Sequence, residues 1–295
     1  MWRAAVVVLT AALAAAAAAA ADPPSAAAPS PSAGDPVQRG AYVFIAAGCY
    51  GCHTDEKRGG APLAGGRPLA TPFGTFHAPN ITPDPQHGIG GWSDAQFVEA
   101  FRHGRRPDGD ALFPAFPYTA YTKMSERDLL DLKAYLFAQP PVPTPDKPHD
   151  LTPPFGWRFL LPAWQALYLE PGPLADDPAQ PPEWNRGRYL VEALGHCGEC
   201  HSPRGRLGGI DRDRHLAGNP NGPDGDAVPS LRPGPKGIGD WSVADIELAL
   251  ELGMLPDGDF VGGAMAEVVR NSTSKLTPED RRAIAVYLKS LSPAR

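Results

Sequence analysis

Four cysteines form two pairs, and a histidine follows each pair directly. The first group reads Cys-Tyr-Gly-Cys-His over 49–53, and the second reads Cys-Gly-Glu-Cys-His over 197–201. Two thiols at this spacing can add to the two vinyl groups of one porphyrin, and the next histidine then lies under the ring as a ligand of the iron. The sequence therefore predicts two covalently bound haem c groups. The predicted attachment residues are Cys49, Cys52, Cys197 and Cys200, and the predicted proximal ligands are His53 and His201.

Three other uses of cysteine pairs compete with haem attachment. A dithiol redox centre needs a strand–helix context and leaves the following histidines unexplained. One zinc ion bound by four thiolates would need both pairs, although they are almost 150 residues apart and belong to separate copies of a repeat. Structural disulfides are common in exported proteins, but two cysteines this close together hold no long loop. Haem attachment alone explains the cysteines and the histidines together.

The sixth ligand of a c-type electron carrier is usually the thioether of a methionine. After Met1, the sequence contains Met124, Met254 and Met265. Met265 ends the segment Gly-Gly-Ala-Met at 262–265, where a glycine-bearing loop can bring sulfur to iron. We expect Met265 to ligate the second haem, and Met254 to be an ordinary packing residue.

The first haem lacks an equivalent methionine at this place. At the spacing of 149 residues that relates the two halves, Phe116 stands opposite Met265, and phenylalanine cannot ligate iron. Met124 is the only thioether near the end of the first half, and we expect it to reach the iron. The alternatives are a five-coordinate haem or a ligand such as His77 or His103, with Met124 as a core residue.

Both motifs stand in a duplicated framework. Arg-Gly-Ala-Tyr at 39–42 precedes the first motif, and Arg-Gly-Arg-Tyr at 186–189 precedes the second. Farther on, Gly-Ile-Gly-Gly-Trp-Ser at 88–93 recurs 149 residues later with one change, and Pro-Asp-Gly-Asp at 107–110 recurs unchanged. The chain therefore contains two copies of one unit, each with one haem.

Each unit is predicted to consist of helices joined by long loops. Ser93 and Ser242 are each followed three positions later by Gln or Asp, a pattern that begins many helices. The last helices are predicted to begin at Ser125 and at Thr277, which precedes a proline. The 36 prolines and 32 glycines are typical of long irregular connections.

The N-terminus predicts export. Met-Trp-Arg is followed by an uncharged run rich in Ala, Val and Leu, and we expect cleavage near Ala21, with a retained membrane anchor as the alternative. Export to the periplasm agrees with covalent haem attachment, which is completed outside the cytoplasm. The net charge of −6 argues against nucleic acid as a partner.

Several segments are specific as a set: Asn-Ile-Thr-Pro-Asp at 80–84, Gly-Ile-Gly at 88–90, Pro-Ala-Phe-Pro-Tyr at 114–118 and Gly-Gly-Ala-Met at 262–265. With these segments, residues 37–293 resemble the cytochrome c subunits of membrane-associated bacterial alcohol and gluconate dehydrogenases. The resemblance implies an all-α fold of two tandem class I cytochrome c domains. The alcohol dehydrogenase subunits carry three haems, however, and many relatives have methionine where Phe116 stands.

The predicted domain organisation combines the repeat with the composition. We expect a signal peptide over 1–21, a flexible linker over 22–36, a first cytochrome c domain over 37–140, a proline-rich interdomain segment over 141–183 and a second cytochrome c domain over 184–293. The interdomain segment contains the aromatic run 155–164. We expect this run to pack across the two domains rather than to dock a partner.

The resemblance implies a carrier of single electrons without a substrate of its own. The donor would be a dehydrogenase of the flavin, quinoprotein or molybdenum type. The acceptor would be a quinone, an oxidase or another cytochrome, and peripheral association with the membrane is compatible with this role. The alternative is a dihaem enzyme, similar to a peroxidase or a thiosulfate dehydrogenase, with its chemistry at an open first haem. A haem sensor is a third reading, for which the chain shows no output domain.

Overall fold

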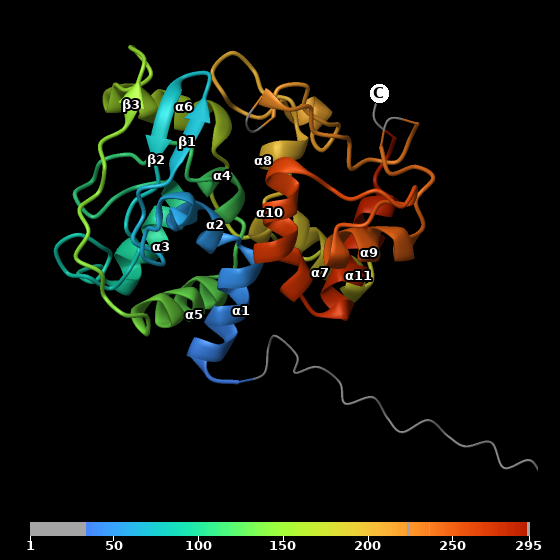
Figure 1. Cartoon of the computed structure of the whole chain (residues 1–295), viewed down its shortest axis with the longest axis horizontal. Helices are drawn as coiled ribbons and strands as arrows, with labels where there is room; N and C mark the ends of the chain where they lie inside the picture. Colours follow the sequence, from blue (N-terminus) through green and yellow to red (C-terminus); the bar gives the residue numbers. More distant parts are fainter. Residues whose placement is uncertain (1–33, 223–224, 236, 294–295) are drawn as a thin grey trace, which may run out of the picture. The chain divides into compact units, whose positions relative to one another are not determined.

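The computed structural model describes residues 34–222, 225–235 and 237–293 (Figure 1). The predicted signal peptide over 1–21, and the linker as far as residue 33, lie outside the described residues. The described residues belong to one compact unit. Within them, no helix has both the length and the apolar character needed to cross a membrane.

The first repeat surrounds the first attachment motif with helices (Figure 1). Its elements, in chain order, are α1 (Pro36–Ala46), α2 (Cys49–His53), η1 (Glu56–Arg58), β1 (Pro68–Thr71), β2 (Gly74–His77), α3 (Asp94–His103), α4 (Tyr118–Tyr121) and α5 (Glu126–Phe137). The segment that follows contains β3 (Asp150–Leu151), η2 (Arg158–Leu160) and α6 (Leu161–Tyr168).

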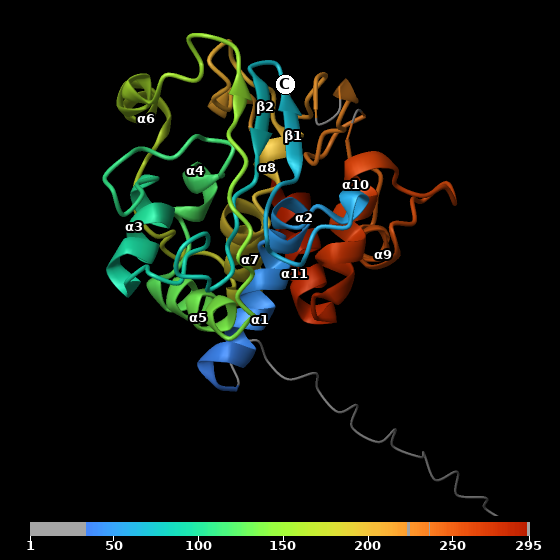
Figure 2. The same cartoon turned by 60° about the vertical axis from the view of Figure 1, so that its left-hand side comes forward.

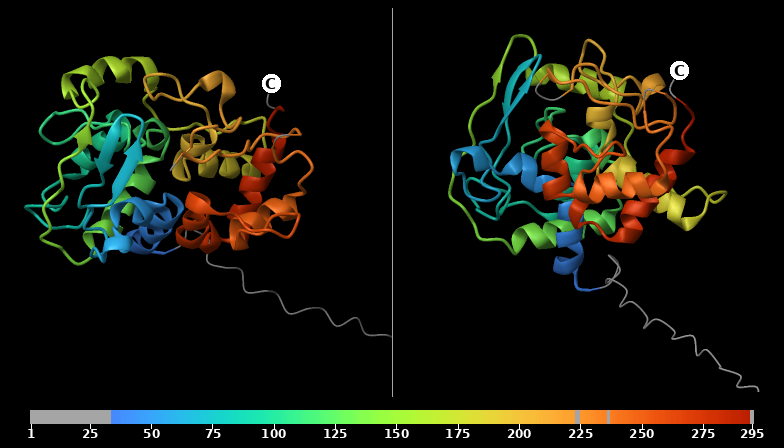
Figure 3. Two further views of the ribbon diagram at one scale, coloured as in Figure 1. Left: turned by 45° about the horizontal axis from the view of Figure 1, so that its top comes forward. Right: turned by 45° about the vertical axis from the view of Figure 1, so that its right-hand side comes forward.

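The second repeat builds a similar set of helices (Figure 3). Its elements are α7 (Pro182–Tyr189), the π-helical turn η3 (Leu190–Leu194), α8 (Gly198–His201), η4 (Arg212–Arg214), α9 (Val243–Leu252), α10 (Gly263–Asn271), η6 (Thr273–Lys275) and α11 (Pro278–Ser290). The mostly helical, two-domain fold predicted from the sequence is confirmed.

The predicted helix starts are also confirmed. Ser93 and Ser242 each cap a helix through a reciprocal capping box, the first with Gln96 and the second with Asp245. Ser125 and Thr277 are the N-caps of α5 and α11, and each side chain accepts an N–H from the first turn. These hydrogen bonds satisfy otherwise unpaired backbone groups at the start of each helix. Because both partners lie within three residues of each other, the sequence alone predicts where these helices begin.

A glycine allows the first and last helices of each domain to cross at close range. A Cβ on Gly40 of α1 would lie 1.8 Å from the backbone oxygen of Asp131 in α5. A Cβ on Gly187 of α7 would lie 1.9 Å from the backbone oxygen of Ala283 in α11. Only glycine fits at either crossing without moving the helices apart.

The arginine before each glycine fixes the same crossing by charge. The side chain of Arg39 donates to both carboxylate oxygens of Asp131, at 2.6 and 2.7 Å. Arg186 forms the same two-point contact with Asp280, at 2.8 and 2.6 Å. Paired hydrogen bonds between a guanidinium and a carboxylate fix both distance and orientation.

The tyrosine at the end of each Arg-Gly-x-Tyr segment contacts the other domain. The hydroxyl of Tyr42 donates to Asp280 in α11, and that of Tyr189 donates to Asp128 in α5, both at 2.6 Å. Each hydroxyl also accepts the N–H of the N-cap residue of the helix it meets, at 3.1 and 2.9 Å respectively. The repeated segment Arg-Gly-x-Tyr therefore builds a helix crossing within its own domain and a reciprocal contact with the other.

A small sheet adds to the predicted helical fold. Strands β1 and β2 form an antiparallel hairpin, and β3 pairs with β2 through the partners Gly74–Leu151 and Thr75–Asp150. Because β3 belongs to the proline-rich segment, the sheet ties that segment to the first domain.

The aromatic run over 155–164 packs across the two domains, as expected, only at its C-terminal end. Trp164 in α6 donates its indole N–H to Leu207 of the second domain at 2.8 Å, and its ring meets Tyr118 of the first. Trp157 and Phe159 instead stack on each other with 51% and 74% of their surfaces exposed.

Candidate functional site

The two attachment motifs form short helical turns with free thiols. Helix α2 begins at Cys49 after Gly48, which adopts a left-handed conformation with φ of 63°, and Cys197 stands at the start of α8. None of the four cysteines is in a disulfide. Burial raises the pKa of Cys49 and Cys197 to about 12, so both thiols are protonated at neutral pH.

A shared zinc site finds no support in this geometry. Within the described part of the chain, no three side chains of His, Cys, Asp or Glu gather closely enough to hold a metal ion. The two cysteine pairs stand in separate turns, and each pair has its own histidine, which fits two separate haem attachments better than joint coordination of one cation.

The histidine of each motif is oriented by a proline carbonyl. Nδ1 of His53 lies 2.8 Å from the backbone oxygen of Pro79, and Nδ1 of His201 lies 2.8 Å from that of Pro229. A carbonyl oxygen only accepts, so Nδ1 carries the proton and Nε2 keeps a free lone pair. Burial lowers the pKa of both imidazoles, which favours the neutral form that binds iron. Both histidines therefore fit the proximal position of a haem.

The loop after each histidine is held by a hydroxyl that follows it. Thr54 Oγ1 accepts the N–H of Leu63 at 3.0 Å, and Ser202 Oγ accepts the N–H of Leu216 at 2.9 Å. Both leucines have a positive φ, 61° and 58°, which is strained for a residue with a side chain. The same hydroxyl-to-leucine contact is thus built twice, in the loops that follow the two proximal histidines.

These leucines support the proline segments in turn. The backbone oxygen of Leu63 accepts the N–H of Ile81 at 2.9 Å, and that of Leu216 accepts the N–H of Leu231 at 3.0 Å. Sequence analysis missed these positioning residues. The repeated pattern Ala-Pro-Asn-Ile at 78–81 and Val-Pro-Ser-Leu at 228–231 is the signal that reveals them.

Met265 lies in a helix and not in the loop that we expected. It is in the first turn of α10, which begins at Gly263. Val269 follows it by four residues, so the two side chains share one face of the helix. Val269 is 7% exposed and approaches Gly253 of the second domain. That face therefore turns towards the domain that contains His201.

Met124 is completely buried in the core of the first domain, just before α5. His77 and His103, the alternative ligands of the first haem, lie in other elements of the first domain. His103 binds Glu99 through Nδ1 at 2.7 Å. His77 is in strand β2, where its backbone N–H donates to His149 Nδ1 at 3.1 Å.

The spacing of 149 residues does not continue to the last helices. The N-caps Ser125 and Thr277 are 152 residues apart, because the second domain has α10 where the first has a loop and the shorter α4. The three additional residues of the second domain lie between Val261 and Thr277, in the stretch that contains Met265. Relative to the last helices, Met124 and Leu276 are the matching pair.

Tyr121 stands between the two attachment motifs. Its hydroxyl donates to the backbone oxygen of Ala47, two residues before the first motif, at 2.8 Å. Its ring contacts that of His196, which directly precedes the second motif, with centroids 5.3 Å apart. Nearby, Thr119 Oγ1 donates to Glu199 within the second motif at 3.1 Å. Helix α4 thus joins the first domain to the second attachment turn.

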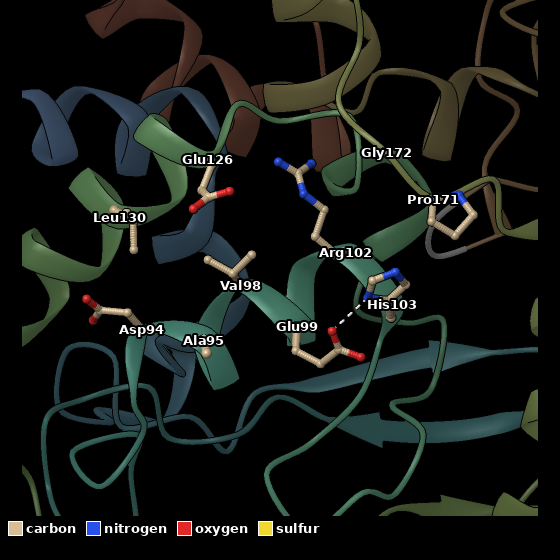
Figure 4. A pocket seen from close by; sticks show the side chains of 10 residues that line it. All are labelled: Asp94, Ala95, Val98, Glu99, Arg102, His103, Glu126, Leu130, Pro171 and Gly172. Carbon is tan, nitrogen blue, oxygen red and sulfur yellow. Dashed lines mark hydrogen bonds and ion pairs between the residues drawn. The ribbon is translucent and has the colours of Figure 1, made fainter.

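Figure 4 shows the residues that line a groove on the first domain. Helices α3 and α5 line it together with Pro171 and Gly172, and Glu99, Arg102 and Glu126 supply most of its charge. None of the attachment cysteines or their histidines lines this groove.

This fold and these two equivalent sites define a c-type cytochrome. The profile of the cytochrome c family matches residues 37–138 and 185–292, and the chain belongs to that family. It is a dihaem protein with two covalently bound haem c groups.

The chain is similar to a dihaem cytochrome and to the cytochrome subunits of dehydrogenases. A dihaem cytochrome c-type protein of Cereibacter sphaeroides is 48% identical over 85% of this chain and 84% of its own length. The cytochrome c subunit of a quinone-dependent alcohol dehydrogenase from Gluconacetobacter polyoxogenes is 42% identical over 87% of this chain and 56% of its own length. The fructose dehydrogenase cytochrome subunit of Gluconobacter japonicus is 40% identical over 88% and 53%. The chain thus spans about half the length of these dehydrogenase subunits.

Proposed function

We propose that this cytochrome accepts single electrons from a dehydrogenase and passes them towards the respiratory chain. The similarity to cytochrome subunits of alcohol and fructose dehydrogenases supports a dehydrogenase as the donor. The donor is of the flavin, quinoprotein or molybdenum type. The acceptor is a quinone, an oxidase or another cytochrome. Both reactions take place in the periplasm, with the protein held at the membrane through its partner.

Each haem, when bound, supplies a one-electron exchange between ferrous and ferric iron. In this proposal the chain's own residues attach, orient and shield it. Cys49 and Cys52 attach the first haem, and Cys197 and Cys200 the second. His53 and His201 would ligate the two irons through Nε2, and Met124 and Met265 would supply thioether ligands. No group of the protein donates or removes a proton in this role.

The observation that carries the proposal is the pair of Nδ1–carbonyl contacts at 2.8 Å. Each leaves one imidazole nitrogen unprotonated beside two free thiols. The same arrangement occurs twice, and this repetition suits a relay between two irons better than one catalytic centre.

The first experiment counts haems in the full-length protein matured in a host with haem-attachment enzymes. Pyridine haemochrome absorbance and intact mass should give two haems per chain. Replacing Cys49 and Cys52 together with Ala should leave one, and so should replacing Cys197 and Cys200. Two haems retained in either double variant would refute the assigned attachment residues.

The second experiment tests the direction of electron flow. The ferric protein is mixed anaerobically with a quinoprotein alcohol dehydrogenase, a flavoprotein gluconate dehydrogenase or a molybdenum dehydrogenase, each with its substrate. At least one should reduce both haems, and omission of substrate should abolish reduction. Rapid turnover of hydrogen peroxide without any dehydrogenase would favour the enzymatic alternative instead.

A further inference from the structure

Helix α10 has two faces that meet different domains. Met265 and Val269 turn towards the second domain, as described above. Glu267 is two residues after Met265 and therefore lies on nearly the opposite side of the helix. That side contacts α2 of the first domain, and the two helices are neighbours in both Figures 1 and 2.

Ion pairs hold α10 against the first domain. Arg67 donates to Glu267 through Nη2 at 2.6 Å, and its other terminal nitrogen donates to the backbone oxygen of Gly51 inside the first attachment motif. Lys57 lies 4.0 Å from Glu267, and Arg270 lies 3.7 Å from Glu56. The Arg67 and Glu267 side chains are only 26% and 24% exposed, so water screens this pair less than an ordinary surface pair.

The segment that carries Met124 is held by the second domain in a similar way. Lys123 directly precedes Met124 and donates to Glu192 at 3.0 Å. Glu192 is 8% exposed and also contacts His215 and Tyr287 of its own domain, each at 3.0 Å. The carboxylate is therefore fixed from within the second domain and presents a rigid anchor to Lys123.

We propose that each domain positions the sixth-ligand segment of the other. Arg67 and Glu267 hold the helix of Met265, and Glu192 and Lys123 hold the segment of Met124. Sixth ligation at either iron then depends on a closed interface between the domains. This inference rests on the proposed function, because it takes both methionines as axial ligands. The four charged residues are positioning residues and do not touch the iron.

The test compares ligation in the full-length dihaem protein and its Glu267→Gln and Glu267→Lys variants. Imidazole competes with the thioether for ferric iron, so its binding reports how firmly methionine is held. Loss of the half-buried Arg67–Glu267 ion pair should strengthen imidazole binding at the second haem by roughly two- to tenfold. Glu267→Lys should have a larger effect than Glu267→Gln. The far-red absorption band of thioether-bound ferric haem should weaken in parallel.

Glu183→Gln is the matched control, because Glu183 pairs with Arg282 inside the second domain at 3.1 Å. It should bind imidazole like the unmodified protein. If the Glu267 variants also behave like the unmodified protein at both haems, the proposal is overturned.

A double-mutant cycle separates this proposal from the ligand assignment. Met265→Leu alone should remove about half of the far-red band. Adding Glu267→Gln should then change nothing further, because no thioether remains to be positioned. An additive effect of Glu267→Gln would overturn the positioning role. An unchanged band in Met265→Leu would instead refute Met265 as a ligand, which belongs to the proposed function.

The reciprocal half uses Lys123→Gln, which leaves Glu192 with its two partners in the second domain. Imidazole binding should strengthen at the first haem by a similar factor, and Met124→Leu should abolish the difference. An effect of Lys123→Gln that persists in the Met124→Leu protein would contradict the reciprocal half.

Discussion

Glu192 is a buried carboxylate at the boundary between the domains, with three polar partners. Burial alone would raise its pKa, but the hydrogen bond to His215 and the charge of Lys123 outweigh this effect and lower the pKa to about 2. A carboxyl group whose pKa is lower in the folded state than in the unfolded chain stabilises the fold while it is ionised.

The stabilisation should disappear in acid. It is complete above the ordinary pKa of 4.5 and is lost as the pH falls towards 2. The shift corresponds to about 3 kcal/mol of unfolding free energy. Chemical unfolding of the unmodified protein between pH 6 and 2 should show this loss, and Glu192→Gln should flatten it. An equally steep acid dependence in Glu192→Gln and in the control Glu183→Gln would exclude Glu192 as its source.

At the scale of single residues, the sequence revealed the groups whose chemistry is local. The spacing of a cysteine pair followed by histidine is enough to predict haem attachment. The nitrogen of His53 that carries the proton depends on Pro79, 26 residues away, and no spacing rule connects them. The strained conformation of Leu63 depends likewise on contacts with distant backbone. Such features require the folded loop.

At the scale of elements, the helix crossings at Gly40 and Gly187 should tolerate no side chain. In Gly40→Ala or Gly187→Ala, the new methyl group would overlap a backbone oxygen of the opposite helix, and the helices would have to separate. We expect each variant to lose about 1–3 kcal/mol of unfolding free energy in denaturant titrations.

Gly91→Ala is the control for these crossings, because an added Cβ there meets nothing within 4 Å. It should be nearly neutral. Equal stability of all three variants would mean that the crossings can open without cost.

Elements with local start signals were predictable, and elements made by tertiary contact were not. The helices after Ser93 and Thr277 could be predicted because each N-cap side chain bonds to a residue only three positions later. Helix α10 begins at a glycine and has no side-chain cap, so the glycine-rich segment before Met265 suggested a loop. Strand β3 consists of two residues and exists only because it pairs with β2.

At the scale of the whole molecule, Tyr42 and Tyr189 should make the two domains unfold together. Each hydroxyl joins an amide and a carboxylate of the opposite domain, and its removal leaves partly buried polar groups without partners. Each change to Phe should cost about 1–3 kcal/mol. The double variant should replace one calorimetric transition with two.

Tyr168→Phe serves as the comparison for this prediction, since its hydroxyl makes no hydrogen bond within the part of the chain that the structure describes. It should retain the single transition. A single transition in the Tyr42→Phe, Tyr189→Phe protein would show that other contacts, such as Lys123–Glu192, suffice to couple the domains.

The exchange of tyrosines between equivalent helix starts has the pattern of an isologous interface, in which one patch meets a copy of itself around a two-fold axis. A free-standing single-haem ancestor with Arg-Gly-x-Tyr ahead of its motif would already carry both halves of that contact and would be able to pair with itself. Joining two copies in one polypeptide makes the pairing independent of concentration. It also lets the copies differ, and here the second domain has α10 where the first has the shorter α4.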